Sequence, residues 1–390
     1  RHRLSDDSKW GGAVGVREAI GQLQGFEIPA GAWETKILSA RCQDYDPQWL
    51  DHLFMAGEVA WGRLRTPKRD EATGKFAAAM TRSMPISLVL REDLPWLLTA
   101  EREASTTNIS TYGEEVLAAL SKRGALFFQE LKAATSLLPS HLEDALRELS
   151  TLGLVTCDMF AAVRTIVGKP AGRRVGRRRL ARPTVAAPAG RWSCFPGLLE
   201  AVAPEDRLMR WCQLLLRRYG VVFRDLLARE SAAPPWCELV RVFRRLELRG
   251  EVRGGRFITG VAGEQFADEG AIGELRAVRE AGPDASWVVL SAVDPLNLAG
   301  IVLAGPRVVA NSKNALILQG GKCVAAQQSD RVEFFDEMPP ELESAMRRAL
   351  QTGKREPNSH LRSSWLDSNR KPRQTPNLTS RVPSRSLRQT

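Results

Sequence analysis

The sequence predicts an α+β multidomain protein in which tandem winged-helix domains are followed by a small β-barrel or β-meander. Three observations support this class. The chain has 390 residues, more than one domain usually holds, and 43% hydrophobic and 26% charged residues, as ordinary globular proteins do. A helix that ends at glycine recurs three times, and short β-rich segments separated by turn residues fill positions 286–335. The sequence contains no run of 18 or more apolar residues, so no membrane span is predicted.

The repeat is a helical segment that opens near a proline and stops at a glycine. Proline favours the first helical position and glycine the position after the last, so this spacing delimits a helix. The prolines are Pro47, Pro139 and Pro235, and the glycines are Gly57, Gly153 and Gly250, spaced by 96 and 97 residues.

Each repeat has the elements of a winged helix. In the second repeat we expect helices over 111–123, 127–137 and 140–152, then strands over 154–157 and 161–167. The third repeat predicts helices over 208–219, 222–229 and 235–249, and a hairpin over 251–261. The first fits less regularly, with helices over 32–41 and 47–56 and strands over 58–64 and 86–90.

The predicted organisation therefore has six parts. They are a winged-helix-like domain (1–108), a winged helix (109–168), a basic linker (169–191), a second clear winged helix (192–266), a β-barrel or meander with a terminal helix (267–350), and a disordered basic tail (351–390).

Basic residues are concentrated in a few of these parts. The formal net charge is +11 and the isoelectric point near 9.7, which suggests a polyanionic partner. The linker contributes +8 and the tail +7, so the rest of the chain carries −4. Within that rest of the chain, the segment 203–264 is the locally basic exception, with twelve basic and eight acidic side chains.

The third repeat is consequently the best nucleic-acid candidate. At about 100° per residue, the apolar positions of its last helix lie on one side and the arginines on the other. The predicted contacts are Arg241, Arg244, Arg245 and Arg249 on this helix, and Arg253 and Arg256 in the wing. The alternative is a solvated or protein-docking face.

Two other charged segments favour different roles. The matching helix of the second repeat carries Glu143, Asp144 and Glu148, which predicts a spacer or an interface. The arginines over 173–182 predict either a general polyanion contact or a flexible tether.

Several phrases resemble the large helicase-related (Lhr) family of superfamily-2 DNA helicases. They are GEVAWGRL (57–64), LREDLPWL (90–97), RRYGVVFR (217–224), RGEVRGGRF (249–257), GEQF (263–266) and SAVDPLNL (291–298). The resemblance covers roughly 4–345 and points to the extension that follows the helicase motor. It implies a string of winged helices ending in a β-barrel, an architecture similar to that of alkylpurine-type DNA glycosylases, and a role in DNA repair.

No segment of this sequence resembles the helicase motor itself. No G-x-x-x-x-G-K-[ST] loop or D-E-x-H box occurs, so ATP and Mg²⁺ are expected only for the motor of the parent protein and no cofactor for this chain. The chain starts without Met, as a piece of a longer protein does. We expect DNA and that motor as partners, a homo-oligomer as an alternative, no membrane, and a cytoplasmic, nucleoid-associated place in a bacterium.

An enzymatic alternative centres on Asp294, which ends an apolar strand. The expected enzyme is a DNA glycosylase for uracil or alkylated bases in the cleft between winged helix and barrel. It needs a carboxylate that activates water or stabilises the sugar cation, and Asn297 could bind a base edge or orient that carboxylate. The competing interpretation is that Asp294 and Pro295 cap a turn. The ten tryptophans are expected mostly in the core.

Overall fold

The structure, a computed structural model, describes residues 1–5, 8–65, 82–98, 109–168, 189–195, 202–282 and 286–352. All of these residues belong to one unit of the chain, residues 1–355. The arginines predicted to form a tether (173–182) and positions 353–390 of the predicted tail lie outside the described ranges, so the predictions for them stay predictions.

The first winged helix of this chain (12–90) is built on two regular helices joined by irregular ones. Its helices are α1 (Gly12–Leu23), η2 (Ala30–Ala32), the π-helix η3 (Trp33–Leu38), α2 (Ser39–Arg41) and α3 (Pro47–Met55). Its strands are β1 (Ile28–Pro29), β2 (Val59–Gly62) and β3 (Pro85–Leu90), in the order β1-β3-β2. Two short helices follow, η4 (Arg91–Asp93) and α4 (Leu94–Leu97).

The second (111–194) and third (204–267) winged helices repeat this order. The second consists of α5 (Thr111–Arg123), β4 (Leu126–Phe127), α6 (Phe128–Thr135), α7 (Pro139–Leu152), β5 (Val155–Cys157), α8 (Phe160–Gly168) and β6 (Arg191–Cys194). The third consists of α9 (Pro204–Tyr219), β7 (Val221–Val222), η6 (Arg224–Ala228), α10 (Trp236–Leu248), β8 (Arg253–Gly255) and β9 (Gln265–Ala267). In every copy the last strand lies between the other two, as the orders β4-β6-β5 and β7-β9-β8 show. The prediction of tandem winged helices is confirmed.

The repeated glycines end their helices as predicted. Gly57, Gly153 and Gly250 have φ of 71°, 72° and 77°, a left-handed conformation in which a side chain is strained. Pro47 and Pro139 open α3 and α7, whereas Pro235 is the residue before α10.

One predicted strand of the second winged helix is wrong. Residues 161–167 lie in helix α8, and the returning strand is β6, which falls across the predicted linker and the start of the predicted third domain. A short apolar run does not by itself separate strand from helix. Here Phe160, Ala162 and Val163 are buried at helical spacing, and the Phe160 ring stacks on Phe54 of α3 at 5.8 Å between centroids.

The C-terminal part is an open sheet, not a barrel. β10 (Trp287–Ser291), β11 (Ala315–Gln319), β12 (Lys322–Gln328) and β13 (Arg331–Phe334) pair antiparallel in sequence order. Among the described residues, β10 and β13 each have one neighbouring strand, so of the predicted barrel or meander the meander is confirmed and the barrel is wrong. The segments 300–303 and 308–309, predicted as strands, form turns and irregular chain apart from one bridge between Ala299 and Leu303.

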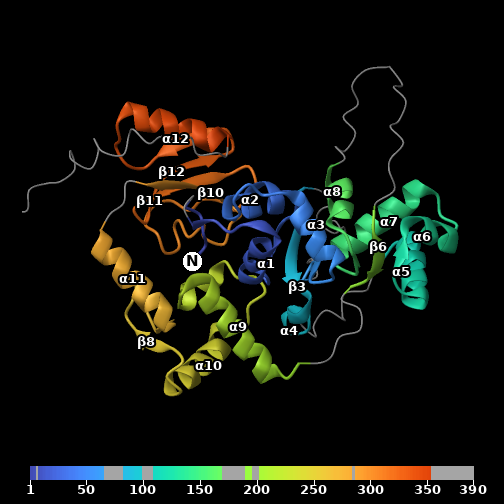
Figure 1. Cartoon of the computed structure of the whole chain (residues 1–390), viewed down its shortest axis with the longest axis horizontal. Helices are drawn as coiled ribbons and strands as arrows, with labels where there is room; N and C mark the ends of the chain where they lie inside the picture. The colour runs from blue at the N-terminus through green and yellow to red at the C-terminus, as the bar shows by residue number, and fades with distance from the viewer. Residues whose placement is uncertain are drawn as a thin grey trace, which may run out of the picture. The chain divides into compact units, whose positions relative to one another are not determined.

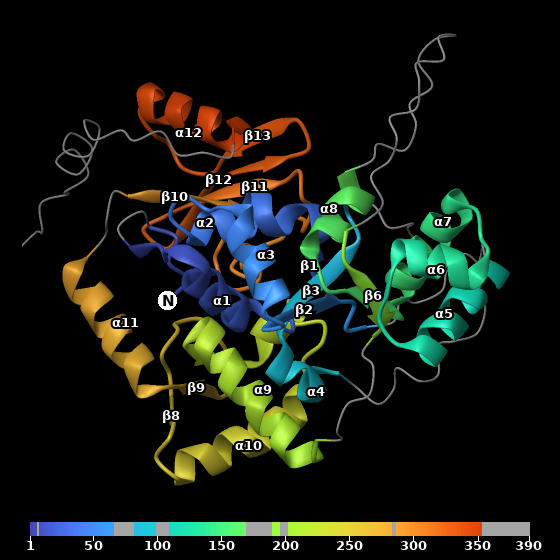
Figure 2. The same cartoon turned by 45° about the vertical axis from the view of Figure 1, so that its right-hand side comes forward.

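Helix α12 (Pro340–Thr352) covers one face of this sheet through Leu342, Met346 and Ala349 (Figure 1). A further helix, α11 (Glu269–Ala281), leads from the third winged helix to the sheet (Figure 2). None of the described helices is long and apolar enough to cross a membrane.

Tryptophans join the winged helices to one another, which confirms the core role predicted for most of them. Trp61 of β2 meets Trp192 of β6 edge to face at 6.3 Å, and both are fully buried. Trp96 of α4 meets Trp211 of α9 in the same way at 5.7 Å. The first winged helix therefore shares apolar cores with both of the others.

Candidate nucleic-acid interface

Helix α10 of the third winged helix has one buried face and one basic face. Leu239, Val242, Phe243 and Leu246 are buried, and the Phe243 ring stacks on Phe266 of β9 at 5.1 Å. This spacing of three and four residues fixes the rotation of the helix, so that its arginines point to solvent.

All six arginines predicted to bind nucleic acid are exposed, but they differ in their ionic partners. Arg244 makes a bidentate pair with Glu264 at 2.9 and 3.0 Å, whose hydrogen bonds raise the pKa of this guanidinium. Arg245 pairs with Glu205 at 3.3 Å, and Arg249 lies 3.8 Å from Glu251.

The other three arginines have no carboxylate partner within the described ranges. They are Arg241 on α10, and Arg253 and Arg256 in the wing. Three guanidinium groups on a helix and its wing are thus free to bind an anion, which is the arrangement that a duplex backbone requires.

The wing is fixed to α10 by residues that sequence reasoning missed. The Gly254 N–H donates to the Glu247 carboxylate at 2.9 Å, and a Cβ at Gly254 would collide with that carboxylate. The Gln265 side chain accepts from the N–H groups of Phe257 and Ile258 at 2.9 and 2.8 Å. A glutamate in the last turn of an arginine-rich helix, Glu247, is the signal that could have indicated this contact.

Helix α7, at the same position in the second winged helix, is used differently. Its end is buried, and the Thr151 carbonyl accepts from Arg63 of the first winged helix at 2.8 Å. Its acidic residues serve local contacts: Arg147 pairs with Glu143 and Asp144, and Glu148 accepts from the N–H of Ser110. This agrees with the interface predicted for this helix.

Asp294 lies in the turn after β10 and is buried, with 1% of its surface exposed. Its two carboxylate oxygens accept from the Arg41 guanidinium at 2.7 and 3.0 Å, and one of them also accepts from the Leu296 N–H at 3.0 Å. Burial alone would raise the pKa of Asp294, but the Arg41 charge and its hydrogen bonds hold that pKa below its usual value.

His2 completes this buried centre. Arg41 donates to Nδ1 of the ring at 3.0 Å, so the proton is on Nε2, which donates to the Arg218 carbonyl at 2.6 Å. Burial, reinforced by the Arg41 charge, lowers the pKa of His2 to about 3 and keeps the ring neutral. Sequence reasoning missed both partners because they lie more than 250 positions from Asp294.

Asn297 lies in the same turn and is 2% exposed. Its Nδ2 donates to the carbonyls of Ala292 and Val308 at 2.9 and 3.0 Å, which ties the turn to the next loop. Arg229 at the end of η6 donates to the Asp294 carbonyl at 3.1 Å. These contacts match the turn-capping interpretation, while the catalytic role predicted for Asp294 and Asn297 stays a prediction.

In the described part of the chain, the two candidate sites are not bonded to each other: no hydrogen bond or ion pair joins an α10 arginine to Asp294. Among the described residues, no group of three or more His, Cys, Asp or Glu side chains is placed to hold a metal ion.

Comparison with known proteins identifies the first and third winged helices. The family models for the third and fourth winged-helix domains of large helicase-related proteins match residues 1–79 and 201–287. The Lhr helicase/uracil glycosylase of Escherichia coli K12 is 30% identical over an alignment of 407 residues that covers 94% of this chain and 25% of that protein. The Lhr helicase/probable uracil glycosylase of Mycolicibacterium smegmatis is 31% identical over an alignment of 319 residues that covers 76% of this chain and 20% of that protein. The chain thus spans a quarter or less of these relatives.

A solved structure, the DNA glycosylase AlkZ of Streptomyces sahachiroi, aligns with 91% of this chain and 94% of its own at 13% identity. The TM-score of 0.46 is too low for a conclusion about fold or activity.

Proposed function

The chain belongs to the large helicase-related family, as part of its C-terminal region, and on this premise we propose that it is the DNA-binding accessory region of an Lhr-type ATP-dependent helicase that acts in DNA repair. The observation that carries the proposal is a group of exposed arginines on α10 and its wing that have no carboxylate partners in the described ranges: Arg241, Arg253 and Arg256.

In this proposal α10 approaches the major groove and the wing follows the adjacent backbone. Arginine suits both the groove contact and the backbone contact, because its planar guanidinium can donate to phosphate oxygens and to the O6 and N7 atoms of guanine. The Glu247–Gly254 hydrogen bond holds the wing against the helix, so both contacts reach the duplex as one rigid surface.

The proposed partners are DNA and the motor domains of the same parent protein, and ATP and Mg²⁺ belong to that motor. With DNA as its partner, the parent protein is expected at the bacterial nucleoid, in the cytoplasm. A homo-oligomer, which would join several motors, is a separate hypothesis that a sedimentation mass tests.

DNA binding is tested with a triple variant, Arg241→Gln, Arg253→Gln and Arg256→Gln. We expect its affinity for a duplex to fall at least about tenfold, and the salt dependence of log K to weaken by about 0.9 for each phosphate that is no longer neutralised. The matched control removes three exposed charges from the second winged helix, with Lys122→Gln, Arg123→Gln and Lys132→Gln. Equal decreases in affinity for the two variants, measured by fluorescence anisotropy across a salt series, would contradict the proposed interface.

A second candidate function is removal of uracil from DNA, which is favoured by the names of both relatives. In it, Asp294 is the proposed carboxylate and Asn297 its helper, and Arg41 must release at least one carboxylate oxygen to give access to the sugar. Opening this buried ion pair costs free energy, which the proposed catalytic role of Asp294 requires.

The glycosylase candidate is tested by incubating the chain with a strand that contains one uracil and measuring abasic sites. Activity that Asp294→Asn abolishes, in a variant whose urea unfolding still shows a folded protein, supports Asp294 as the carboxylate. Activity unchanged in that variant moves the chemistry elsewhere, and no abasic product removes the candidate.

A further inference from the structure

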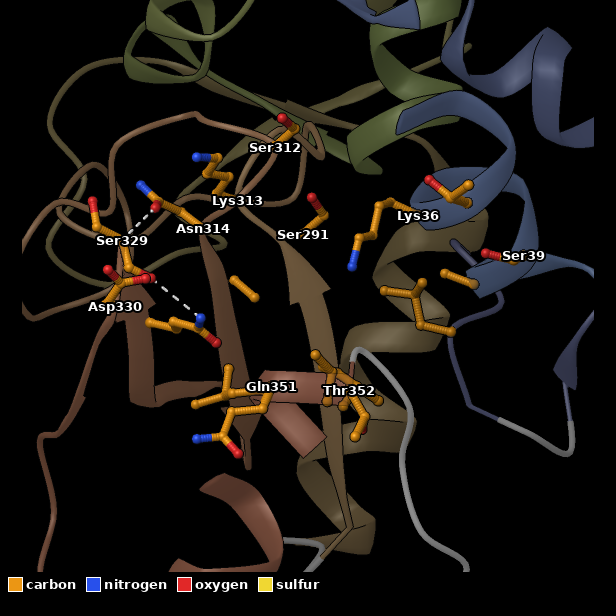
Figure 3. A pocket seen from close by; sticks show the side chains of 18 of the residues that line it. Lys36, Ser39, Ser291, Ser312, Lys313, Asn314, Ser329, Asp330, Gln351 and Thr352 are labelled. Carbon is orange, nitrogen blue, oxygen red and sulfur yellow. Dashed lines mark hydrogen bonds between the residues drawn. The ribbon is translucent and has the colours of Figure 1, made fainter. Parts of the chain in front are cut away.

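A polar cavity of about 780 Å³ lies between the first winged helix and the C-terminal sheet. One wall is η3 and α2, with Lys36 and Ser39; the other is formed by β10, the turn before β11 and the end of β12 (Figure 3). The last turn of α12, with Gln351 and Thr352, borders it as well. The volume is within the range of about 300–1,000 Å³ typical of small-molecule sites.

The cavity has a positive lining. Lys9, Lys36 and Lys313 line it against one carboxylate, Asp330, so its formal charge is +2. In the described part of the chain, the ammonium groups of Lys36 and Lys313 have no ion-pair partner. Figure 3 shows the Lys36 side chain reaching towards the middle of the cavity from the helical wall, while Ser312 and Lys313 lie at its opposite edge.

Unused hydrogen-bonding atoms also line this cavity. Ser291 is 8% exposed, and its Oγ has no hydrogen-bond partner among the described residues. The Oε1 of Gln327 is likewise buried and without a partner there, although its Nε2 donates to the Ser329 carbonyl at 3.2 Å. Buried polar atoms are normally paired, so a hydroxyl donor and an amide acceptor left open in one cavity point to a polar ligand.

The frame of the cavity is rigid where the lysines are attached. Asn311 Oδ1 accepts from the Lys313 N–H at 2.9 Å. The buried Asn314 donates to the Val309 carbonyl and accepts from the Ser329 N–H, both at 2.9 Å. Lys36 lies on the π-helix η3, a form that is frequent at functional sites. The Arg41–Asp294 pair joins α2 to the turn after β10 and so connects the two walls.

We propose that this cavity binds one nucleotide of a single DNA strand. The phosphate is bound by Lys36 and Lys313, and the hydroxyl of Ser291 and the amide of Gln327 contact the base or sugar. The inference rests on the proposed function in one respect: a DNA-binding chain supplies the nucleotide as part of a strand. The site is distinct from α10, since none of the α10 or wing arginines lines it.

The test uses thymidine monophosphate, a single nucleotide with one phosphate, which is not part of a strand that could also contact α10. We expect saturable binding by calorimetry, weakened at least about tenfold by Lys36→Gln with Lys313→Gln, because the ligand is then without both cations that pair its phosphate. The control double variant is Lys132→Gln with Lys322→Gln, two exposed lysines outside the cavity, which should bind within about twofold of the original chain. Ser291→Ala should weaken binding of the nucleotide while leaving that of inorganic phosphate unchanged.

With an eight-nucleotide single strand, the Lys36 and Lys313 variant should lower the salt slope by about 0.7, because the one phosphate that these lysines bind is no longer neutralised. Absence of saturable nucleotide binding, or equal effects of the two double variants, overturns the proposal. Inorganic phosphate or a glutamate-rich peptide that binds as tightly as the nucleotide also overturns it. The Arg241, Arg253 and Arg256 variant separates the two hypotheses: failure of the α10 interface shows as unchanged duplex binding, whereas failure of the cavity shows only with the mononucleotide and the single strand.

Discussion

Arginine has opposite uses in two regions of this molecule. Arg41 and Arg218 are completely buried, and their guanidinium groups are occupied by Asp294, His2, Glu230 and backbone carbonyls. On α10 and its wing, the arginines are exposed, and half of the six have no carboxylate partner in the described ranges. The net charge of the chain counts both groups equally. Only the exposed group can contribute to binding a polyanion, whereas the buried group connects segments that are distant in the sequence.

The strongest way to break this comparison is to remove a partner of the buried group. Asp294→Ala leaves the Arg41 guanidinium buried beside a neutral methyl group, and we expect the free energy of unfolding to fall by about 3–5 kcal/mol. Urea unfolding measures it. Arg241→Ala, at the exposed surface, should change stability by less than about 0.5 kcal/mol. A decrease below about 1 kcal/mol for Asp294→Ala would mean that the centre is hydrated or already open.

A second effect concerns the pH dependence of this centre. The unfolded chain protonates His2 below about pH 6.5, while the folded ring stays neutral until its pKa of about 3 is reached. Between these values the unfolded state binds more protons, so the free energy of unfolding should fall by up to about 1.4 kcal/mol per pH unit as the pH decreases.

The measurement is urea unfolding between pH 7 and pH 4.5, with His2→Gln as the comparison. Asp294 does not interfere in this window, because its lowered pKa means that its contribution disappears only at more acidic pH. The variant should show a flatter pH profile. An equally steep profile in the variant would assign the proton uptake to another group.

The smallest expected effect sharpens the exposed side of the comparison. Glu264→Gln removes the acceptor of Arg244, and because an exposed pair contributes about 0.2–1 kcal/mol, duplex affinity should rise by about 1.4- to fivefold. Lys132→Glu, a charge change of opposite sign outside the proposed interface, serves as control for general electrostatics. Unchanged affinity after Glu264→Gln would place Arg244 outside the contact surface.

The winged helices could be predicted because their signals are local. Apolar spacing, a helix-ending glycine and a basic opposite face are all visible within about 20 residues, as α10 and Gly250 show. The strand β6 could not be placed, since its pairing partners β4 and β5 lie more than 30 positions away and its four residues carry no strand pattern of their own. Strands were also expected at 300–303 and 308–309, but these segments form turns and irregular chain, and the Asn297 amide donates to the Val308 carbonyl there.

The candidate sites show the same division. The exposure of the α10 arginines followed from helical periodicity, but the acids that pair three of them did not. The environment of Asp294 depends on Arg41 and His2, which only the fold brings to it. The polar cavity was not predicted, because its lysines belong to a helix and a turn that are almost 280 residues apart.

The late position of β6 also affects how the chain folds during synthesis. Trp192 fills the core beside Trp61, and the Phe195 ring, which follows β6, packs so closely on Gly62 that a Cβ there would overlap it. A nascent chain that has left the ribosome only to residue 190 thus has two winged helices with unfinished cores. Both must wait for the same few residues and then close together, so the first two winged helices should fold as one cooperative step rather than one after the other.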